Sequence, residues 1–266
     1  MDHLQKKISL QANSIQVGYA GKTVLDELSL DIVQGDVTAL VGPNGSGKST
    51  LLKTLARLLR PTLGEVYLDG RLISRMATRE VARQMAILPQ QQIAPAGLTV
   101  RELIEQGRFA HSGPLRMFQK QDHEAIDRAI EVTRTGQFVN RPVESLSGGE
   151  RQRVWIAVIL AQDTPILLLD EPTTFLDIGY QLDVLALVEE LNQEHGLTIV
   201  LVLHDLNQAA RYASRLIVLN KGAIYADGPP ADVLTAELLA DVFRVRAQII
   251  TYPEQNVPIC IPLESR

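Results

Sequence analysis

The sequence predicts an α/β fold with a mixed β-sheet and an inserted helical subdomain. Short apolar runs rich in β-branched residues alternate with stretches of helical spacing, as in folds that cover a sheet with helices. Between Gln90 and Ser145 such runs are absent, and helical spacing appears at Val100–Arg108 and Asp122–Thr135, around a turn at Ala110–Pro114. The predicted strands are Ile8–Val17, Val37–Val41, Ile166–Leu169, Thr198–Leu203 and Arg215–Leu219.

A glycine-rich loop separates the strand that ends at Val41 from a predicted helix, Leu51–Leu59, which Pro61 stops. The loop fits G-x-x-x-x-G-K-[ST], in which backbone N–H groups surround phosphates while lysine and hydroxyl meet charge and magnesium. A bound phosphate would lie at a helix N-terminus. A chance glycine turn is the alternative, and the flanking strand and helix disfavour it. The predicted nucleotide-binding residues here are Gly42, Pro43, Asn44, Gly45, Ser46, Gly47, Lys48, Ser49 and Thr50.

A second apolar run, Ile166–Leu169, ends in the carboxylates Asp170 and Glu171. Its length and composition predict a buried parallel strand. At such a strand end Asp170 can complete the shell of a magnesium ion, while Glu171 can orient or deprotonate the attacking water. Taken alone, the pair would equally fit an ordinary solvated strand end. The phosphate loop upstream favours the catalytic interpretation.

The segment Leu146–Glu150 reads Leu-Ser-Gly-Gly-Glu and precedes a predicted helix, Gln152–Leu160. Gly148 and Gly149 allow a close approach of the backbone to a phosphate, and the Ser147 hydroxyl can donate to it at the positive end of the helix. Ser147 and the glutamate three residues later also match a capping box, so the segment can be a helix cap as well.

Three further residues are candidates on weaker signals. Gln90 follows a strand-like segment, although Gln91 and Gln92 leave the register ambiguous and a polar surface loop is the alternative. His204 ends a strand, where a structural histidine is the alternative. Tyr19 precedes a glycine-containing turn, where a buried anchor is the alternative.

Together these motifs resemble an ATP-binding cassette (ABC) ATPase, from Tyr19 to about Gly228. The resemblance implies a phosphate-loop ATPase core with an antiparallel β subdomain, residues 1–89 and 146–266 forming the core and 90–145 the helical subdomain. It implies ATP and Mg²⁺ as cofactors and a head-to-tail homodimer. Two positions differ from the residues that are common in the family: Glu150 stands where glutamine is common, and Phe175 stands where a small residue is common. The departure at Phe175 leaves undecided how the two subunits of the dimer communicate.

The resemblance assigns each candidate a role. Glu171, His204 and Gln90 would be catalytic, as the base, the γ-phosphate switch and the loop glutamine. Tyr19 would stack on adenine, and Ser147, Gly148 and Gly149 would contact the γ-phosphate on the second subunit. The implied metal ligands are Ser49, Gln90 and Asp170.

The C-terminal third resembles the ATPases of ferric-siderophore, haem and cobalamin importers, the siderophore branch most closely, in His204–Ala213, Asp227–Pro230 and Arg244–Ile259. This implies ATP hydrolysis that powers import through separate permease subunits, supplied by a periplasmic or lipoprotein substrate-binding protein. The chain would lie on the cytoplasmic face of the inner membrane. A haem or cobalamin importer, a soluble non-transport ABC ATPase and an inactive nucleotide-binding module are the alternatives; the presence of Glu171 and His204 argues against the last.

The composition agrees with a globular protein. The chain has 266 residues, 45% of them hydrophobic, and a net charge of −5. It has no apolar run of the roughly 18 residues that cross a membrane, and its polar start, Met1–Lys7, is no secretory signal. One cysteine, Cys260, excludes an internal disulfide and is expected to serve packing. Basic residues form no stripe, so we expect no nucleic-acid partner.

Overall fold

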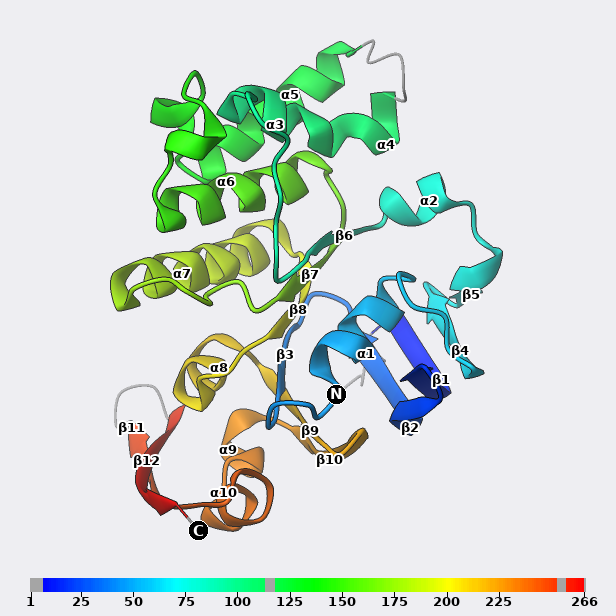
Figure 1. Ribbon diagram of the computed structural model, residues 1–266, viewed down its shortest axis with the longest axis vertical. Helices are drawn as coiled ribbons and strands as arrows, with labels where there is room; N and C mark the ends of the chain where they lie inside the picture. Colours follow the sequence, from blue (N-terminus) through cyan, green and yellow to red (C-terminus); the bar gives the residue numbers. More distant parts are fainter. Residues whose placement is uncertain (1–6, 113–117, 253–256, 266) are drawn as a thin grey trace, which may run out of the picture. The chain divides into compact units, whose positions relative to one another are not determined.

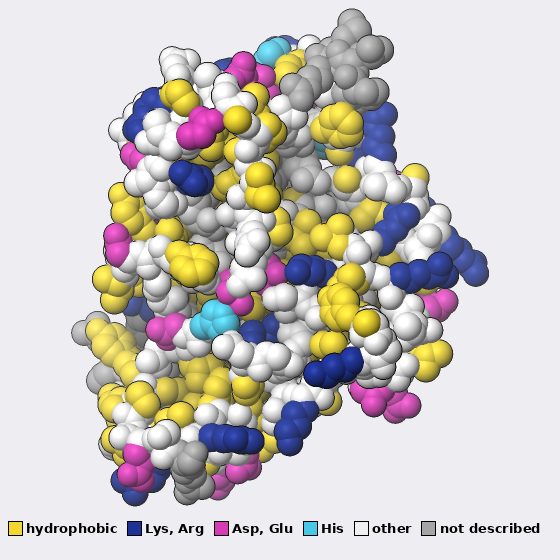
Figure 2. All heavy atoms as spheres, in the orientation of Figure 1, with side chains coloured by type: hydrophobic (Ala, Val, Ile, Leu, Met, Phe, Trp, Pro, Cys, Tyr) yellow, Lys and Arg dark blue, Asp and Glu magenta, His cyan; other side chains and the backbone are white. Residues whose placement is uncertain are grey.

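The computed structural model describes residues 7–112, 118–252 and 257–265 (Figure 1). The chain divides into two compact units, residues 1–75 with 192–266, and residues 76–191. No helix within the described ranges is both long and apolar enough to cross a membrane. On the face drawn in Figure 2, hydrophobic side chains are scattered among polar and charged ones.

The first unit contains an antiparallel sheet in the order β2-β1-β4-β5. Two of its connections are two-residue turns, Ala20-Gly21 with φ of 47° and 82° and Asp69-Gly70 with φ of 46° and 73°. Positive φ at both positions is the type I′ geometry that matches the twist of paired strands. The predicted antiparallel β subdomain is confirmed. Its strands are β1 (Ile8–Tyr19), β2 (Lys22–Val33), β4 (Leu63–Leu68) and β5 (Arg71–Leu72).

The same unit contains strands of a mixed sheet. β3 pairs in parallel with β8 and with β9, and β10 pairs antiparallel with β9 across a third two-residue turn, Lys221-Gly222. Every residue of β3 and β8 is buried, as is typical of parallel strands covered on both faces. These strands are β3 (Val37–Val41), β8 (Thr198–Val202), β9 (Arg215–Asn220) and β10 (Ala223–Gly228).

The helix after the phosphate loop is shorter than predicted. It ends at Leu55, and Arg57 adopts a left-handed φ of 61°, so the chain leaves the helix well before Pro61. The other helices of this unit, and a C-terminal hairpin, are α8 (Leu206–Tyr212), α9 (Pro230–Val233), α10 (Ala236–Phe243), β11 (Val245–Tyr252) and β12 (Val257–Ser265).

The C-terminal hairpin is fastened to α8. The side-chain amide of Asn207 donates to the carbonyl of Cys260 at 3.1 Å, and the Cys260 N–H donates back to the amide oxygen of Asn207 at 2.7 Å. Cys260 is buried, as expected of a packing residue, and burial raises the pKa of its thiol to about 11.

Helices dominate the second unit, where α3 (Val100–Glu105), α5 (Lys120–Val132) and α6 (Gly148–Ala161) lie together (Figure 1). Arg108 and Asp122 form a buried ion pair at 2.8 Å, and Arg108 also donates to the carbonyl of Ala161 at 2.9 Å. The apolar core around them comprises Val100, Leu103, Ile104, Ile126, Ala129, Phe138, Val143, Leu146, Val154, Ala157 and Ala161.

One prediction for this unit is wrong. Ala110–Ser112 belongs to a short helix rather than a turn, because it continues from the helical turns at Gln106–Arg108; Gly113 and Pro114 lie outside the described residues. The helices are α2 (Thr78–Ala82), α3 (Val100–Glu105), α4 (Phe109–Ser112), α5 (Lys120–Val132), α6 (Gly148–Ala161) and α7 (Ile178–His195), and the parallel strands are β6 (Met85–Leu88) and β7 (Ile166–Asp170).

Candidate functional site

The phosphate loop joins the buried strand β3 to helix α1 (Lys48–Leu55) in the first unit. Lys48 is 5% exposed, and its ammonium donates to the carbonyls of Gly42 at 2.8 Å and Pro43 at 3.0 Å. Gly42 has a φ of 146°, and a Cβ there would lie 2.2 Å from the Leu219 carbonyl oxygen. The backbone therefore curls around the lysine in a path that only glycine can follow at this position.

Two features suit this loop to phosphate. The Ser46 hydroxyl is buried without a hydrogen-bond partner among the described residues. Gly47 is the N-cap of α1 and makes no side-chain cap hydrogen bond, because glycine has no side chain to cap the helix. A buried donor next to an uncapped helix N-terminus is the arrangement that binds phosphate oxygens.

His204 lies at the same sheet edge as the loop. β8 runs parallel to β3, and the Leu203 N–H donates to the Leu40 carbonyl at 3.2 Å, so the two chains leave their strands together. The His204 side chain is exposed. The next residue, Asp205, accepts hydrogen bonds at 2.8 and 3.0 Å from the first-turn N–H groups of α8 and fixes the helix behind the histidine.

Tyr19 ends β1 and is 48% exposed, which contradicts the alternative of a buried anchor. The hairpin that carries Tyr19 packs on the phosphate loop, because a Cβ at Gly47 would lie 2.5 Å from the Leu25 side chain in β2. The ring of Tyr19 is thus available at the end of a hairpin anchored to the loop.

The second unit brings a glutamine and two carboxylates together. β6 and β7 are parallel, so the residues after Leu88 and Leu169 leave the sheet at one edge. Asp170 closes β7 and is fully buried, and Glu171 follows with a φ of 54°, which is uncommon for a residue other than glycine. The amide of Gln90 donates to Oε2 of Glu171 at 2.6 Å.

Gln90 and Gln92, which the sequence left as alternatives, form hydrogen bonds with different partners. Gln92 donates to the carbonyl of Pro89 at 2.7 Å, whereas Gln90 meets the carboxylate. The amide oxygen of Gln90, the carboxylate of Asp170 and the hydroxyl of Ser49 are all hard oxygen donors, the ligand type that Mg²⁺ prefers. The predicted metal ligands therefore fit that ion in their donor chemistry.

The Leu-Ser-Gly-Gly-Glu segment begins α6 at Gly148. Ser147 is its N-cap: its hydroxyl accepts from the Glu150 N–H at 3.3 Å, and its own N–H donates to the Glu150 carboxylate at 2.8 Å. The N–H and hydroxyl of Ser147 lower the pKa of Glu150. A Cβ at Gly149 would lie 2.3 Å from the Tyr180 ring, so this ring of α7 packs directly on the segment.

Within each unit the structure gathers part of the predicted set. The phosphate loop, His204 and the hairpin of Tyr19 meet in the first unit; Gln90, Asp170 and Glu171 meet in the second. Sequence reasoning assigned Thr174 no contact with the predicted base, yet its hydroxyl donates to Oε2 of Glu171 at 3.1 Å. Its only signal was a hydroxyl three residues after a strand-end carboxylate, a spacing that a turn can close.

The chain matches the family described as ABC transporter over residues 25–174. It is 46% identical over 253 residues to the iron(3+)-hydroxamate import ATP-binding protein FhuC of Bacillus subtilis strain 168, covering 95% of this chain and 94% of that protein. It is 47% identical over 254 residues to the ferric enterobactin transport ATP-binding protein FepC of Escherichia coli K12, covering 96% of this chain and 94% of that protein.

Two solved structures are similar. An inward-facing putative metal-chelate type ABC transporter matches with a TM-score of 0.83 and 28% identity, covering 97% of this chain and 98% of that one. A dimeric ATP-binding cassette in a post-hydrolysis state with bound ADP and Pi matches with a TM-score of 0.71 and 30% identity, covering 83% of this chain and 98% of that one. The predicted fold class is confirmed.

Proposed function

Since this chain belongs to the ABC transporter family, we propose that it is the ATP-hydrolysing subunit that powers import of a ferric siderophore through a separate transmembrane permease. The observation that carries the hydrolytic part is the pairing of Gln90 with Glu171 at the end of a buried strand. It holds a carboxylate that can act as a general base toward water beside an amide that hydrogen-bonds it.

The residues of the site divide the work by their chemistry. Lys48 and the buried Ser46 hydroxyl bind the ATP phosphates, and the N–H groups of α1 complete the cradle. Glu171 takes a proton from the attacking water, and His204 contacts the γ-phosphate. Tyr19 stacks on adenine. Ser49, Asp170 and Gln90 would supply oxygen ligands to Mg²⁺, which would neutralise charge at the phosphates.

We propose that the active form is a homodimer in which Ser147, Gly148 and Gly149 contact ATP held by the other subunit's phosphate loop. Ser147 and Gly148 are exposed at the positive end of α6, where they can meet a γ-phosphate. Beside them, Phe175 in the turn before α7 and Ile178 at the start of α7 are apolar residues with 96% and 75% exposure, which suit contact with a second copy.

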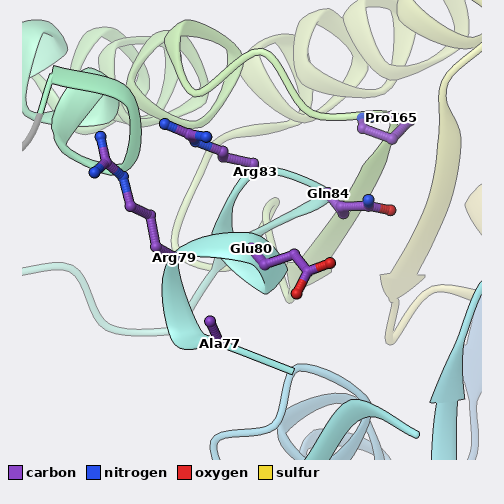
Figure 3. A pocket seen from close by; sticks show the side chains of 6 residues that line it. All are labelled: Ala77, Arg79, Glu80, Arg83, Gln84 and Pro165. Atoms are coloured by element: carbon purple, nitrogen blue, oxygen red, sulfur yellow. The ribbon is translucent and has the colours of Figure 1, made fainter. Parts of the chain in front are cut away.

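The permease is proposed to dock on the second unit. An open pocket there is lined by Ala77, Arg79, Glu80, Arg83, Gln84 and Pro165 (Figure 3). Arg79 and Arg83 hold the carbonyl of Ala110 at 2.7 and 3.1 Å, so α4, within the proposed helical subdomain 90–145, is fastened beside this pocket. A cytoplasmic helix of the permease would lie in the pocket and sense movement of the loop at Gln90, only two residues after β6.

Disulfide cross-linking tests this docking surface. Cys260 is the single cysteine and is buried, so a cysteine introduced by Ala77→Cys is the only reactive one. It should cross-link to a cysteine in a cytoplasmic loop of the permease. Glu124→Cys, on the exposed face of α5, is the matched control and should not. Equal cross-linking of both positions would remove the pocket from the proposal.

The cargo is inferred from the named relatives, whose substrates are iron(3+)-hydroxamate and ferric enterobactin. A haem or cobalamin importer is the second candidate. We propose that the chain acts on the cytoplasmic face of the inner membrane, where it is attached through the permease. A periplasmic or lipoprotein binding protein would deliver the cargo to the permease.

Uptake in cells tests the cargo. Cells that lack this chain should recover uptake of a radiolabelled ferric siderophore when the wild-type chain is supplied, and Glu171→Gln should not restore it. Uptake of haem and cobalamin should be the same in all three strains. Recovery of haem or cobalamin uptake instead would replace the proposed cargo.

A further inference from the structure

We infer that Thr174 is a positioning residue for hydrolysis, which holds the carboxylate of Glu171 in the orientation that meets the attacking water. The inference rests on the proposed role of Glu171 as the base. Thr174 acts through that carboxylate and not on the nucleotide.

Two donors from different elements converge on one carboxylate oxygen. Oε2 of Glu171 accepts from the hydroxyl of Thr174 at 3.1 Å and from the amide of Gln90 at 2.6 Å. Two hydrogen bonds to one oxygen restrict rotation of the carboxylate about its terminal torsion, which is otherwise broad. The carboxylate plane is therefore set by its neighbours.

The backbone brings Thr174 to this position. Its N–H donates to the carbonyl of Glu171 at 3.3 Å and closes a turn of four residues. Left-handed residues flank this segment: Glu171, the first residue of the turn, has a φ of 54°, and Phe175, which directly follows the turn, has a φ of 64°. Such strain at non-glycine residues persists only where the surroundings impose it, and it clusters at functional sites. The turn places the hydroxyl over the carboxylate three residues before it.

The two donors, Gln90 and Thr174, differ in how firmly they are tied to Glu171. Gln90 lies on the loop after β6 and is also a proposed ligand of Mg²⁺, so its amide would leave Glu171 if the side chain turned to the metal. Thr174 lies in the same turn as Glu171 and moves with it. A donor that stays with the carboxylate preserves its orientation when Gln90 turns to the nucleotide, and misplacement of a catalytic group by about 1 Å can cost up to about 100-fold in rate.

The test is the Mg²⁺-dependent ATPase activity of the purified full-length chain. Thr174→Val keeps the shape and removes the hydroxyl, and we expect kcat to fall about tenfold with KM for ATP unchanged. Thr174→Ser keeps the hydroxyl and should stay within about twofold of wild type. Thr133→Val is the matched control, because it removes a buried hydroxyl of the same unit that bonds the carbonyl of Ala129, and its kcat should not change.

A double variant separates positioning from general damage. When Glu171→Gln has removed the base, adding Thr174→Val should cause no further loss of turnover, because the hydroxyl has no base left to orient. Wild-type kcat in Thr174→Val, equal losses in the valine and serine variants, or an additive loss in the double variant would each overturn the inference. Near-normal turnover in Glu171→Gln would instead overturn the proposed base itself.

Discussion

The amide of Gln90 lies 2.6 Å from Oε2 of Glu171, joining two residues that are 81 positions apart in the chain. The parallel pairing of β6 with β7 makes this possible, because both strands end at the same edge. Gln90 opens the loop that leads to the helices of the second unit. A change at the carboxylate, such as the arrival of water and nucleotide, can therefore be transmitted along the chain to those helices.

The first prediction separates binding from turnover. Lys48→Ala should weaken ATP binding, since the ammonium lies in the loop that surrounds the phosphates. Glu171→Gln should bind ATP normally and lose turnover by at least about 100-fold, because only the base is removed. Equilibrium binding and phosphate release on the purified variants check both. Near-normal turnover in Glu171→Gln would exclude Glu171 as the base.

Much of this site could be predicted because its chemistry is local in sequence. The phosphate loop follows the buried strand β3, and the two carboxylates lie at the end of the buried strand β7, and the apolar runs of both strands are unbroken. Ser147 and Glu150 were readable as a cap, and their hydrogen bonds confirm the capping box. The hydrogen bond between Thr174 and Glu171 could not be predicted from the sequence. It depends on a strained turn in which residues other than glycine adopt positive φ angles, and no residue type in the turn indicates those angles.

The second prediction concerns composite sites, the proposed ATP sites that combine the phosphate loop of one subunit with Ser147–Gly149 of the other. Ser147→Arg should leave ATP binding by a single subunit nearly intact and abolish hydrolysis, because its bulk blocks the partner's site. Ser147→Ala removes the hydroxyl without adding bulk, at a cost of about 1 kcal/mol in stability, so it should retain more hydrolysis than Ser147→Arg.

Mixed dimers sharpen this test. In dimers that pair Ser147→Arg with Lys48→Ala, one site collects both changes and the other neither, so partial ATPase activity should return. Absence of recovery in dimers whose pairing is verified would count against composite sites that act independently.

The third prediction concerns the buried pair of Arg108 and Asp122. Burial opposes ionisation of Asp122, but the Gln119 N–H and the Arg108 guanidinium outweigh it and lower the pKa of this carboxyl. Asp122→Asn should reduce the free energy of unfolding by about 3 kcal/mol, since Arg108 stays buried without its counter-charge. Asp127→Asn, in the exposed pair with Arg101, should cost less than about 1 kcal/mol.

The pH dependence of this loss has a defined sign. Because the pKa is lowered in the folded state, the stabilisation is present above the unfolded value near 4 and disappears as the pH falls through the folded value. Urea unfolding should therefore show wild type and Asp122→Asn converging below about pH 4. A constant difference between them down to strongly acidic pH would contradict the ionic origin.

Phe175 gives the fourth prediction, in which fold stability and dimerisation do not change together. The residue is 96% exposed in a left-handed conformation, so Phe175→Gly should leave the stability of the fold unchanged or raise it by up to about 1 kcal/mol. ATP-dependent dimerisation, measured by size exclusion in the Glu171→Gln background, should weaken. Phe109→Ser, at 57% exposure on α4, is the control and should dimerise normally. Unchanged dimerisation of Phe175→Gly would remove this side chain from the interface.

Four of the strands that the sequence analysis did not predict, β2, β4, β5 and β10, share one reason. They are partly exposed and mix polar with apolar residues, so they lack the continuous apolar runs that predicted β3 and β7. Their turns carried the better signal: Ala20-Gly21, Asp69-Gly70 and Lys221-Gly222 each place glycine second in a two-residue turn. The early end of α1 at Leu55 had no comparable signal, because helix formers continue to Leu59.

Reconstitution tests the central claim most directly. With its permease in bilayer discs, the ATPase activity of this chain should rise when a substrate-binding protein loaded with ferric siderophore is added, and the isolated chain should ignore the siderophore at any concentration. Stimulation by a loaded sugar-binding protein instead, or direct binding of the siderophore by the isolated chain, would contradict the account.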